Sequence, residues 1–135
     1  MNPESLNNKT LLGKFLRMPL RIIPKNLVVN ILHGPLKGMK WKVGSSIHGC
    51  WMGLYELDKQ LIIKNRVKKG MIAYDIGANA GIYTLLFARY VQNKGKVFAF
   101  EPLGENAVNL LNHVKLNNLS NVTLIQSAVS NKSGL

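Results

Sequence analysis

The sequence lacks most features of secreted, membrane-spanning or metal-binding proteins. Cys50 is the only cysteine among 135 residues, so no disulfide can form within the chain, which is usual in a reducing compartment. No apolar run approaches the length of about 18 residues that a transmembrane helix needs. The N-terminus has no continuous apolar core of a signal peptide, and no Cys/His spacing is typical of a metal site. We therefore expect a cytoplasmic protein without a metal.

Acidic residues are also scarce. The chain has 18 Lys and Arg against 6 Asp and Glu, a formal net charge of +12. Residues 1–70 hold 13 of the basic and 3 of the acidic residues. Such an excess indicates either an anionic partner or a surface of solvated lysines. Basic and aromatic residues are not interleaved as in RNA-binding proteins, so we expect no nucleic-acid partner.

Three regions are predicted. Residues 1–26 form a basic amphipathic segment, because apolar residues recur at helical spacing before Pro19 and Pro24 interrupt the pattern. The apolar part, residues 11–23, either contacts an anionic membrane peripherally or packs on the protein's own domain or a partner subunit. Residues 27–69 form a small β-hairpin followed by a helix, and residues 70–135 form an α/β domain.

Within residues 27–69, alternating and β-branched residues predict two strands. The Gly- and Ser-rich stretch 44–53 is expected to be a loop. A helix is expected over residues 54–67, with Leu54, Leu57 and Leu61 on one face.

The last region alternates apolar strands with amphipathic helices. Buried strands are expected at residues 71–75, 97–101 and 121–126, with helices over 81–92 and 104–117. A β-α-β-α-β order with apolar strands indicates a parallel sheet with right-handed crossovers. In the second helix, helical spacing predicts a buried face, and His113 is expected at the surface. The residues expected on this face are Ala107, Leu110, Leu111 and Val114.

The first strand of this domain ends in Asp75-Ile-Gly-Ala-Asn-Ala-Gly81. In an open α/β sheet, ligands bind at the carboxyl ends of the strands, where Gly77 would let a ligand approach closely. A dinucleotide fingerprint would need glycine where Asn79 and Ile82 stand. Asp75 would repel a pyrophosphate but suits a cationic ligand, such as S-adenosylmethionine (SAM) with its amino and sulfonium groups.

Glu101 ends the second strand, 20 residues after Gly81. A carboxylate at this point can accept hydrogen bonds from ribose hydroxyls. Taken singly, Asp75 could instead cap the next turn and Glu101 could be a surface acid. Together, in a βαβ unit at this spacing, the two carboxylates favour cofactor binding.

These motifs resemble those of the FkbM-type SAM-dependent methyltransferases. The resemblance rests on Asp75–Gly81, on Phe98-Ala-Phe-Glu-Pro102, on Asn121–Val129 and on Gly53-Leu-Tyr-Glu56, and it covers roughly residues 34–135. It implies a Rossmann-like class I methyltransferase fold with SAM as the cofactor. It also implies methyl transfer, usually to oxygen, with a sugar, glycan or small metabolite as the acceptor.

The resemblance also assigns roles to residues. Gly77, Asn79 and Gly81 would line the cofactor, and Ser127 and Ala128 would approach the adenine. Tyr55 and Glu56 could close over the methionine end. Alternatively, Glu56 is only an acid at a helix start, where it complements the helix dipole.

A general base is harder to assign. His48 is the candidate among three histidines, although a loop histidine is more often structural. Complete sheets of this class have seven strands and this sequence supplies three, so we expect an incomplete chain, or an oligomer or missing C-terminal half that completes it. Two other hypotheses remain, a non-catalytic SAM-binding remnant and a basic surface-associated interaction module.

Overall fold

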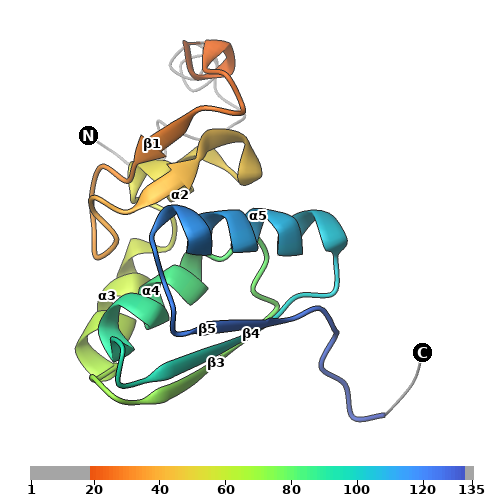
Figure 1. Cartoon of the computed structure of the whole chain (residues 1–135). Coiled ribbons are helices and arrows are strands. Elements are labelled where there is room, and N and C mark those ends of the chain that lie inside the picture. The colour runs from red at the N-terminus through yellow and green to blue at the C-terminus, as the bar shows by residue number, and fades with distance from the viewer. Residues whose placement is uncertain (1–18, 133–135) are drawn as a thin grey trace.

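The computed structural model describes residues 19–132 (Figure 1). The helix expected before Pro19 lies outside these residues. No helix in the described part has the length and apolar character needed to cross a membrane. The elements are η2 (Pro19–Ile22), β1 (Val28–Asn30), β2 (Lys40–Lys42), η3 (Val43–Ser45), α2 (His48–Met52), α3 (Leu57–Arg66), β3 (Ile72–Ile76), α4 (Ile82–Val91), β4 (Lys96–Phe100), α5 (Gly104–Leu116) and β5 (Val122–Ile125).

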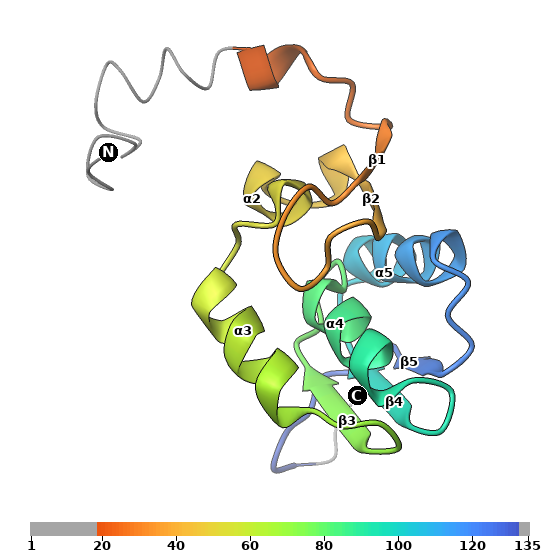
Figure 2. The same cartoon turned by 90° about the vertical axis from the view of Figure 1, so that its left-hand side faces the viewer.

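Strands β3, β4 and β5 form a parallel sheet in that order. Helices α4 and α5 lie together over one face of the sheet, and α3 runs beside α4 (Figures 1 and 2). Leu110 of α5 is fully buried against the sheet in a cluster with Ala99, whereas Leu85 and Leu86 of α4 are buried against residues of the first region. The expected α/β architecture, a partial parallel sheet preceded by a small α+β region, is confirmed.

The other face of the sheet carries no helix among the described residues (Figure 1). Ile72, Tyr74 and Ile76 point to this face and are 62%, 62% and 63% exposed. The expectation that strand 71–75 is buried was therefore wrong for three of its five residues, Met71, Ile72 and Tyr74. The reason is that an apolar run predicts cover on both faces, whereas the described helices cover only one.

The first region contains the expected hairpin. Strands β1 and β2 pair antiparallel, with Val29 opposite Trp41. The expected loop at 44–53 was wrong, because η3 and α2 occupy most of it. Gly53 adopts a left-handed conformation (φ 75°) and its N–H bonds to the carbonyls of Cys50 and Gly49, which ends α2.

Helix α3 begins later than predicted, at Leu57. Glu56, immediately before it, has left-handed backbone angles (φ 43°, ψ 46°), so the chain N-terminal to it cannot continue the helix. Leu54 and Leu61 are exposed, contrary to the expected apolar face. Gln60 is buried instead, because its Nε2 donates to the Tyr55 carbonyl at 2.6 Å.

Helix α5 differs from expectation at two positions. Leu111 is exposed, and His113, expected at the surface, is fully buried. Its Nε2 accepts the Lys42 N–H at 3.1 Å, so its Nδ1–H donates to the Ala80 carbonyl at 2.8 Å. Its ring stacks on Trp41 with centroids 3.8 Å apart. These partners come from distant parts of the chain, which is why a helical pattern could not reveal them.

Candidate functional site

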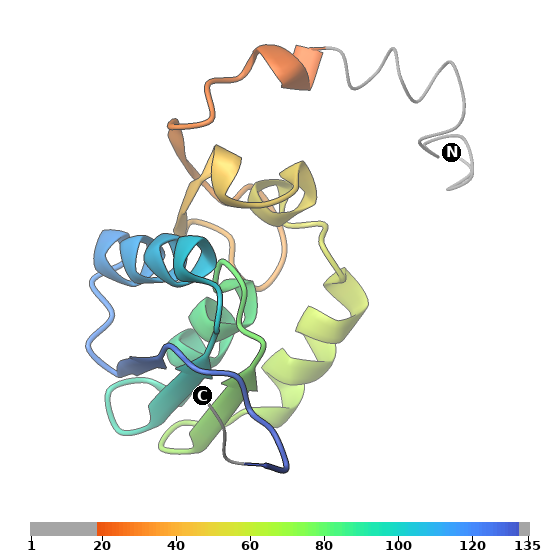
Figure 3. The same cartoon turned by 90° about the vertical axis from the view of Figure 1, so that its right-hand side faces the viewer.

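The loop between β3 and α4 rises from the sheet toward α5 (Figure 3), where Gly81 lies against Leu110 and the Ala80 carbonyl accepts from His113. The N–H groups of Gly77 and Ala78 both donate to the Phe100 carbonyl at 2.9 Å, which ties the loop to the end of β4. Gly77 has a φ of 75°, and a Cβ placed on it would meet no atom within 4 Å. The backbone at Gly77 is therefore open to a ligand.

Gly81 has a different role. Its φ is 96°, and a Cβ there would lie 2.9 Å from Cγ of Leu110. A side chain would force α4 away from α5. Gly81 therefore sets the packing that fixes where α4 begins.

Asp75 is buried at the end of β3. Its Oδ2 accepts the hydroxyl of Thr84 at 2.5 Å, and the Thr84 backbone N–H also reaches the carboxylate. Burial raises the pKa of Asp75, the Thr84 hydrogen bonds oppose this, and the charge of Glu101 adds to it. Asp75 thus caps the first turn of α4, as one interpretation of the sequence proposed.

Glu101 is only 4% exposed, so it is not a surface acid. Its carboxylate accepts the N–H groups of Asn79 at 2.7 Å and Leu103 at 2.9 Å, and the amide of Asn106 at 3.4 Å. A carboxylate has about four acceptor positions, so capacity for a further donor remains. Glu101 joins the β3 loop to the end of β4.

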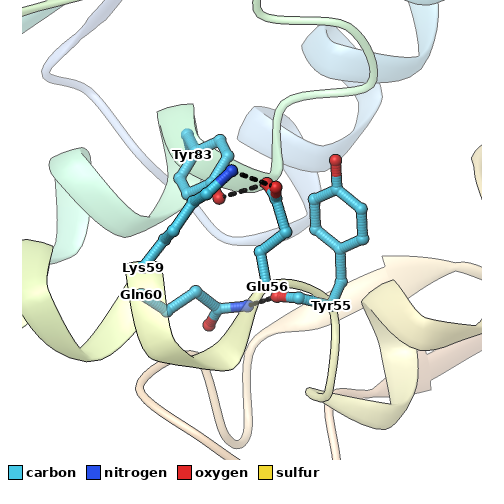
Figure 4. A network of polar contacts seen from close by, with 5 residues as sticks. All are labelled: Tyr55, Glu56, Lys59, Gln60 and Tyr83. Carbon is cyan, nitrogen blue, oxygen red and sulfur yellow. Dashed lines mark hydrogen bonds and ion pairs between the residues drawn. The ribbon is translucent and has the colours of Figure 1, made fainter.

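Tyr55 and Glu56 lie at the start of α3, with their side chains extending in the same direction (Figure 4). The Glu56 carboxylate accepts the hydroxyl of Tyr83 at 2.6 Å and forms an ion pair with Lys59. The hydrogen bonds from Lys59 and Tyr83 lower the pKa of Glu56. Glu56 is therefore a fixed negative charge beside the first turn of α4.

Two cavities meet at Tyr83. The first, which we call the acidic cavity, has a volume of about 340 Å³ and is lined by Glu56, Lys59, Ile62, Ile63, Tyr74, Asp75, Tyr83 and Phe87. The second, which we call the loop cavity, has a volume of about 220 Å³ and is lined by Trp41, Ser46, Cys50, Tyr55, Gly77, Ala78, Asn79, Ala80, Ile82 and Tyr83.

The remaining predicted site residues, Ser127, Ala128 and His48, line neither of the two cavities. Ser127 and Ala128 are exposed directly after β5, at the same sheet edge as Glu101, whose N–H bonds to the Ile125 carbonyl. His48 lies in α2, where its Nδ1 accepts the indole N–H of Trp51 at 2.9 Å, and it lines neither cavity. Within residues 19–132 no cluster of His, Cys, Asp or Glu could hold a metal ion.

Three residues at the two cavities or in contact with Asp75 were not predicted as site residues: Tyr83, Thr84 and Trp41. Tyr83 and Thr84 follow Gly81 by two and three positions and so lie in the first turn of α4. Their positions in that turn could have suggested that they face β3. Trp41 is separated from the loop by more than thirty residues. Only the docking of the hairpin onto the α/β region brings it there.

No family model matches the sequence, and no curated protein matches it. Among solved structures, the chain is similar to a Clostridium thermocellum protein assigned as an rRNA methylase, with a TM-score of 0.51 and 29% identity, over 53% of this chain and 39% of that one. It is also similar to Trm5b from Pyrococcus abyssi, with a TM-score of 0.53 and 19% identity, over 76% of this chain and 29% of that one.

A SAM-dependent methyltransferase from Aquifex aeolicus also matches, with a TM-score of 0.48 and 28% identity, over 57% of this chain and 40% of that one. The fold is the Rossmann-like fold of methyltransferases. The chain spans less than half the length of each of these structures.

Proposed function

We propose that the chain is the SAM-binding part of a methyltransferase of FkbM type. The observation that carries the proposal is the placement of two buried carboxylates, Asp75 and Glu101, at the ends of adjacent parallel strands, with the open backbone of Gly77 between them. The likeness to methyltransferase structures supports this proposal, and the motif resemblance supports the narrower family.

The residues present fit SAM. Glu101 has acceptor capacity for ribose hydroxyls, and Ser127 and Ala128 would border the adenine beside it. The acidic cavity is lined by two carboxylates, Glu56 and Asp75, against one ammonium, that of Lys59, which pairs with Glu56, so its formal excess of one negative charge suits a cationic cofactor. Gly77 and Asn79, which line the loop cavity, would form the floor of the site, whereas Gly81 lines neither cavity.

SAM, when bound, supplies a methyl group on a sulfonium that a nucleophile can displace directly. The contribution of this chain is to hold and orient that donor, and positioning of this kind supplies much of the rate of such reactions. A hydroxyl acceptor would also need a general base. His48 remains the candidate, although its bond to Trp51 indicates a structural role.

For the acceptor we propose a sugar, glycan or small-metabolite hydroxyl, methylated in the cytoplasm. Although the sequence pattern predicts no nucleic-acid partner, RNA is the second candidate, favoured by the net charge of +12 and by the similarity to the protein assigned as an rRNA methylase. An acceptor screen with the complete protein separates the two, since RNA binding would weaken steeply with salt. Peripheral membrane contact through residues 11–23 and completion of the sheet by a partner or C-terminal half stay proposals.

Substitution of Glu101 tests the proposal. We expect Glu101→Ala to weaken SAM binding at least tenfold, measured by calorimetry. We also expect the free energy of unfolding to fall by about 1–3 kcal/mol, because the N–H groups of Asn79 and Leu103 lose their acceptor. Glu105→Ala is the matched control, because Glu105 is an exposed acid in the first turn of α5.

The possible results separate the proposed function from the two alternative hypotheses. Unchanged SAM affinity in a folded Glu101→Ala variant would show that the ribose assignment is wrong. Absence of SAM binding by the unsubstituted chain would contradict the proposed function and favour the surface-associated interaction module. SAM binding by the complete protein without turnover on any acceptor would favour the non-catalytic remnant.

A further inference from the structure

Helix α5 and strand β5 lie together on one flank of the molecule, and α3 lies on the opposite flank (Figures 2 and 3). Residues 103–131, which contain both elements, carry only one acidic residue, Glu105, and one Lys or Arg, Lys115. The formal charge of this segment is therefore zero, in a chain of net charge +12. Two copies of so basic a chain repel each other, and this flank is where the repulsion is weakest.

The exposed face of α5 carries an acid near one end, a base near the other and apolar side chains between them. Glu105 and Lys115 are exposed, and Val108 and Leu111 are 58% and 40% exposed. Because residues three or four apart lie on the same side of a helix, these four residues form one stripe. Neither Glu105 nor Lys115 forms an ion pair within residues 19–132.

This stripe is complementary to a second copy of itself in the antiparallel orientation. Leu110 is midway between Glu105 and Lys115 along the helix. If two α5 helices cross antiparallel at Leu110, Glu105 of each copy lies opposite Lys115 of the other, and Val108 and Leu111 meet at the centre. A parallel arrangement would place like charges together, so the charge pattern favours a two-fold axis across the helix.

A groove beside the end of α5 adds to this complementarity. It has a volume of about 400 Å³ and is lined by Val28, Lys42, Asn112, Lys115 and Leu116. Two ammonium groups and no carboxylate line the groove, so it attracts an acid from outside. In the antiparallel arrangement, the α5 end that carries the acid of the second copy lies beside this groove.

Strand β5 has a free edge on the same flank. It pairs with β4 on one side and with no other strand among the described residues. The Asn121 and Ile125 carbonyls accept N–H groups from β4 and the residue after it. Because the direction of bonding alternates along a strand, the N–H and C=O groups of Val122 and Leu124 point toward the free edge.

This edge lacks the features that usually protect exposed edges from pairing, which are charged residues, prolines and bulges. Residues 116–131 contain no charged residue and no proline, and the register with β4 is continuous from Val122 to Ile125. Leu124 packs against the cluster that contains Leu110. One two-fold axis can therefore pass close to the centres of both α5 and β5.

We propose that two copies of the chain associate about a two-fold axis through α5 and the free edge of β5, with Glu105 of each copy paired to Lys115 of the other. The two β5 strands then run antiparallel and join the two sheets into one. This dimer does not depend on the proposed function. It leaves the opposite edge, β3, and the acidic cavity beside that strand open.

Exchange of the two charges tests the helix contact. Sedimentation velocity is measured on the chain carrying Ile76→Lys, which blocks association through the exposed face of the sheet. We expect a dimer. Glu105→Lys and Lys115→Glu each place like charges opposite each other, so each should raise the dimer Kd by about tenfold or more. The double variant Glu105→Lys/Lys115→Glu restores opposite charges and should restore the dimer.

A mixture of the two single variants provides a second measurement. Each variant alone should be mainly monomeric, whereas an equimolar mixture should form a heterodimer, because a face with two lysines meets a face with two glutamates. Charge reversal at the helix ends also opposes the helix dipole, so a purely structural effect would be largest in the double variant. Recovery of the dimer in that variant therefore distinguishes pairing from loss of helix.

Leu111→Arg tests the same surface if circular dichroism shows that the charge-reversed chains do not fold. It brings two cations together near the axis and should abolish the dimer. Leu61→Arg is the matched control, because Leu61 is 44% exposed on α3 at the opposite flank, and it should leave the Kd unchanged. Hydrogen exchange tests the strand contact, since the Val122 and Leu124 amides should be protected in the dimer and exchange faster in Leu111→Arg.

A monomer at every protein concentration would overturn the proposal and leave this flank to a different partner. A dimer that survives Glu105→Lys, Lys115→Glu and Leu111→Arg would place the contact elsewhere on the molecule. Equal dissociation by Leu61→Arg would show that added charge alone separates the copies. Fast exchange of both β5 amides in the dimer would exclude pairing through the strand edge.

Discussion

Gly77 and Gly81 both have positive φ angles in one loop, yet the space around them differs. Open space lies above Gly77, whereas Leu110 lies against Gly81. The sequence alone could identify both as ligand-lining glycines. It could not separate them, because the difference depends on a helix more than twenty residues away.

We expect Gly77→Ala and Gly81→Ala to separate binding from stability. Gly77→Ala should cost only about 1 kcal/mol of unfolding free energy, from backbone strain, but should weaken SAM binding more than tenfold. Gly81→Ala should cost about 2–4 kcal/mol, because its methyl group also overpacks against Leu110. Urea denaturation and calorimetry measure the two effects, and a larger stability loss in Gly77→Ala would contradict this assignment.

The carboxylates illustrate what residue-level reasoning could and could not predict. The motif placed Asp75 and Glu101 at strand ends, and the parallel register confirms it. The Thr84 contact to Asp75 and the Asn79 contact to Glu101 depend on how the loop closes. Helix cap and ligand contact are compatible roles for Asp75, because a carboxylate at the wall of a cavity can accept from both the helix and a ligand.

At the scale of elements, strand β3 is packed on one face and paired on one edge. It pairs with β4 on one edge only, and its outer face presents Ile72, Tyr74 and Ile76. The Tyr74 ring stacks on Phe98 and Phe100, with centroids 5.5 and 6.4 Å apart, which extends the apolar surface across the sheet. An exposed apolar sheet face with a free edge favours association.

We expect the chain to bind the dye ANS through this face. Substitution of Ile76 by Lys should lower the ANS fluorescence and the sedimentation-average mass, because it places a charge within the apolar surface. Ile22→Lys is the matched control, since Ile22 is also exposed but lies in η2, away from the sheet. A fall of equal size in the control would show that the dye reports general surface hydrophobicity.

The periodicity of the chain predicted the order and type of the major elements well. The predicted burial and helix bounds were wrong where contacts from another element decide them. The exposed Leu111 and the buried His113 exchanged their expected positions in α5, because Lys42 and Ala80 supply polar partners inside the fold. Helix α3 begins later than predicted because Glu56 has a left-handed backbone conformation. The helix propensity of glutamate does not predict that conformation.

At the scale of the whole molecule, His113 links the hairpin region to the α/β region and makes stability depend on pH. Burial lowers its pKa to about 4, the Ala80 hydrogen bond opposes this, and the charge of Lys42 adds to it. The unfolded chain, with a histidine pKa of about 6.5, therefore binds more protons between these values. Stability should be greatest above pH 6.5 and fall toward pH 4, by on the order of 3 kcal/mol.

Urea denaturation at several pH values checks this expectation. His113→Phe should be less stable at pH 7 but should lose most of the dependence between pH 6.5 and 4. What remains should reflect Asp75, whose raised pKa has the opposite sign and favours the fold as the pH falls, and Glu56, whose lowered pKa destabilises the fold as the pH falls. His33→Asn, which changes an exposed histidine, should retain the slope, and a flat profile for the unsubstituted chain would refute the role of His113.

The bond between the Lys42 N–H and His113 joins residues 71 positions apart in the chain. Strand β2 is synthesised well before α5, so Trp41 has no ring to stack on until the second helix of the α/β region exists. Long loops must close before such contacts form, and this slows folding. The hairpin region should therefore acquire its native packing late, and a pause in translation between Lys42 and His113 would leave Trp41 exposed to chaperones and proteases.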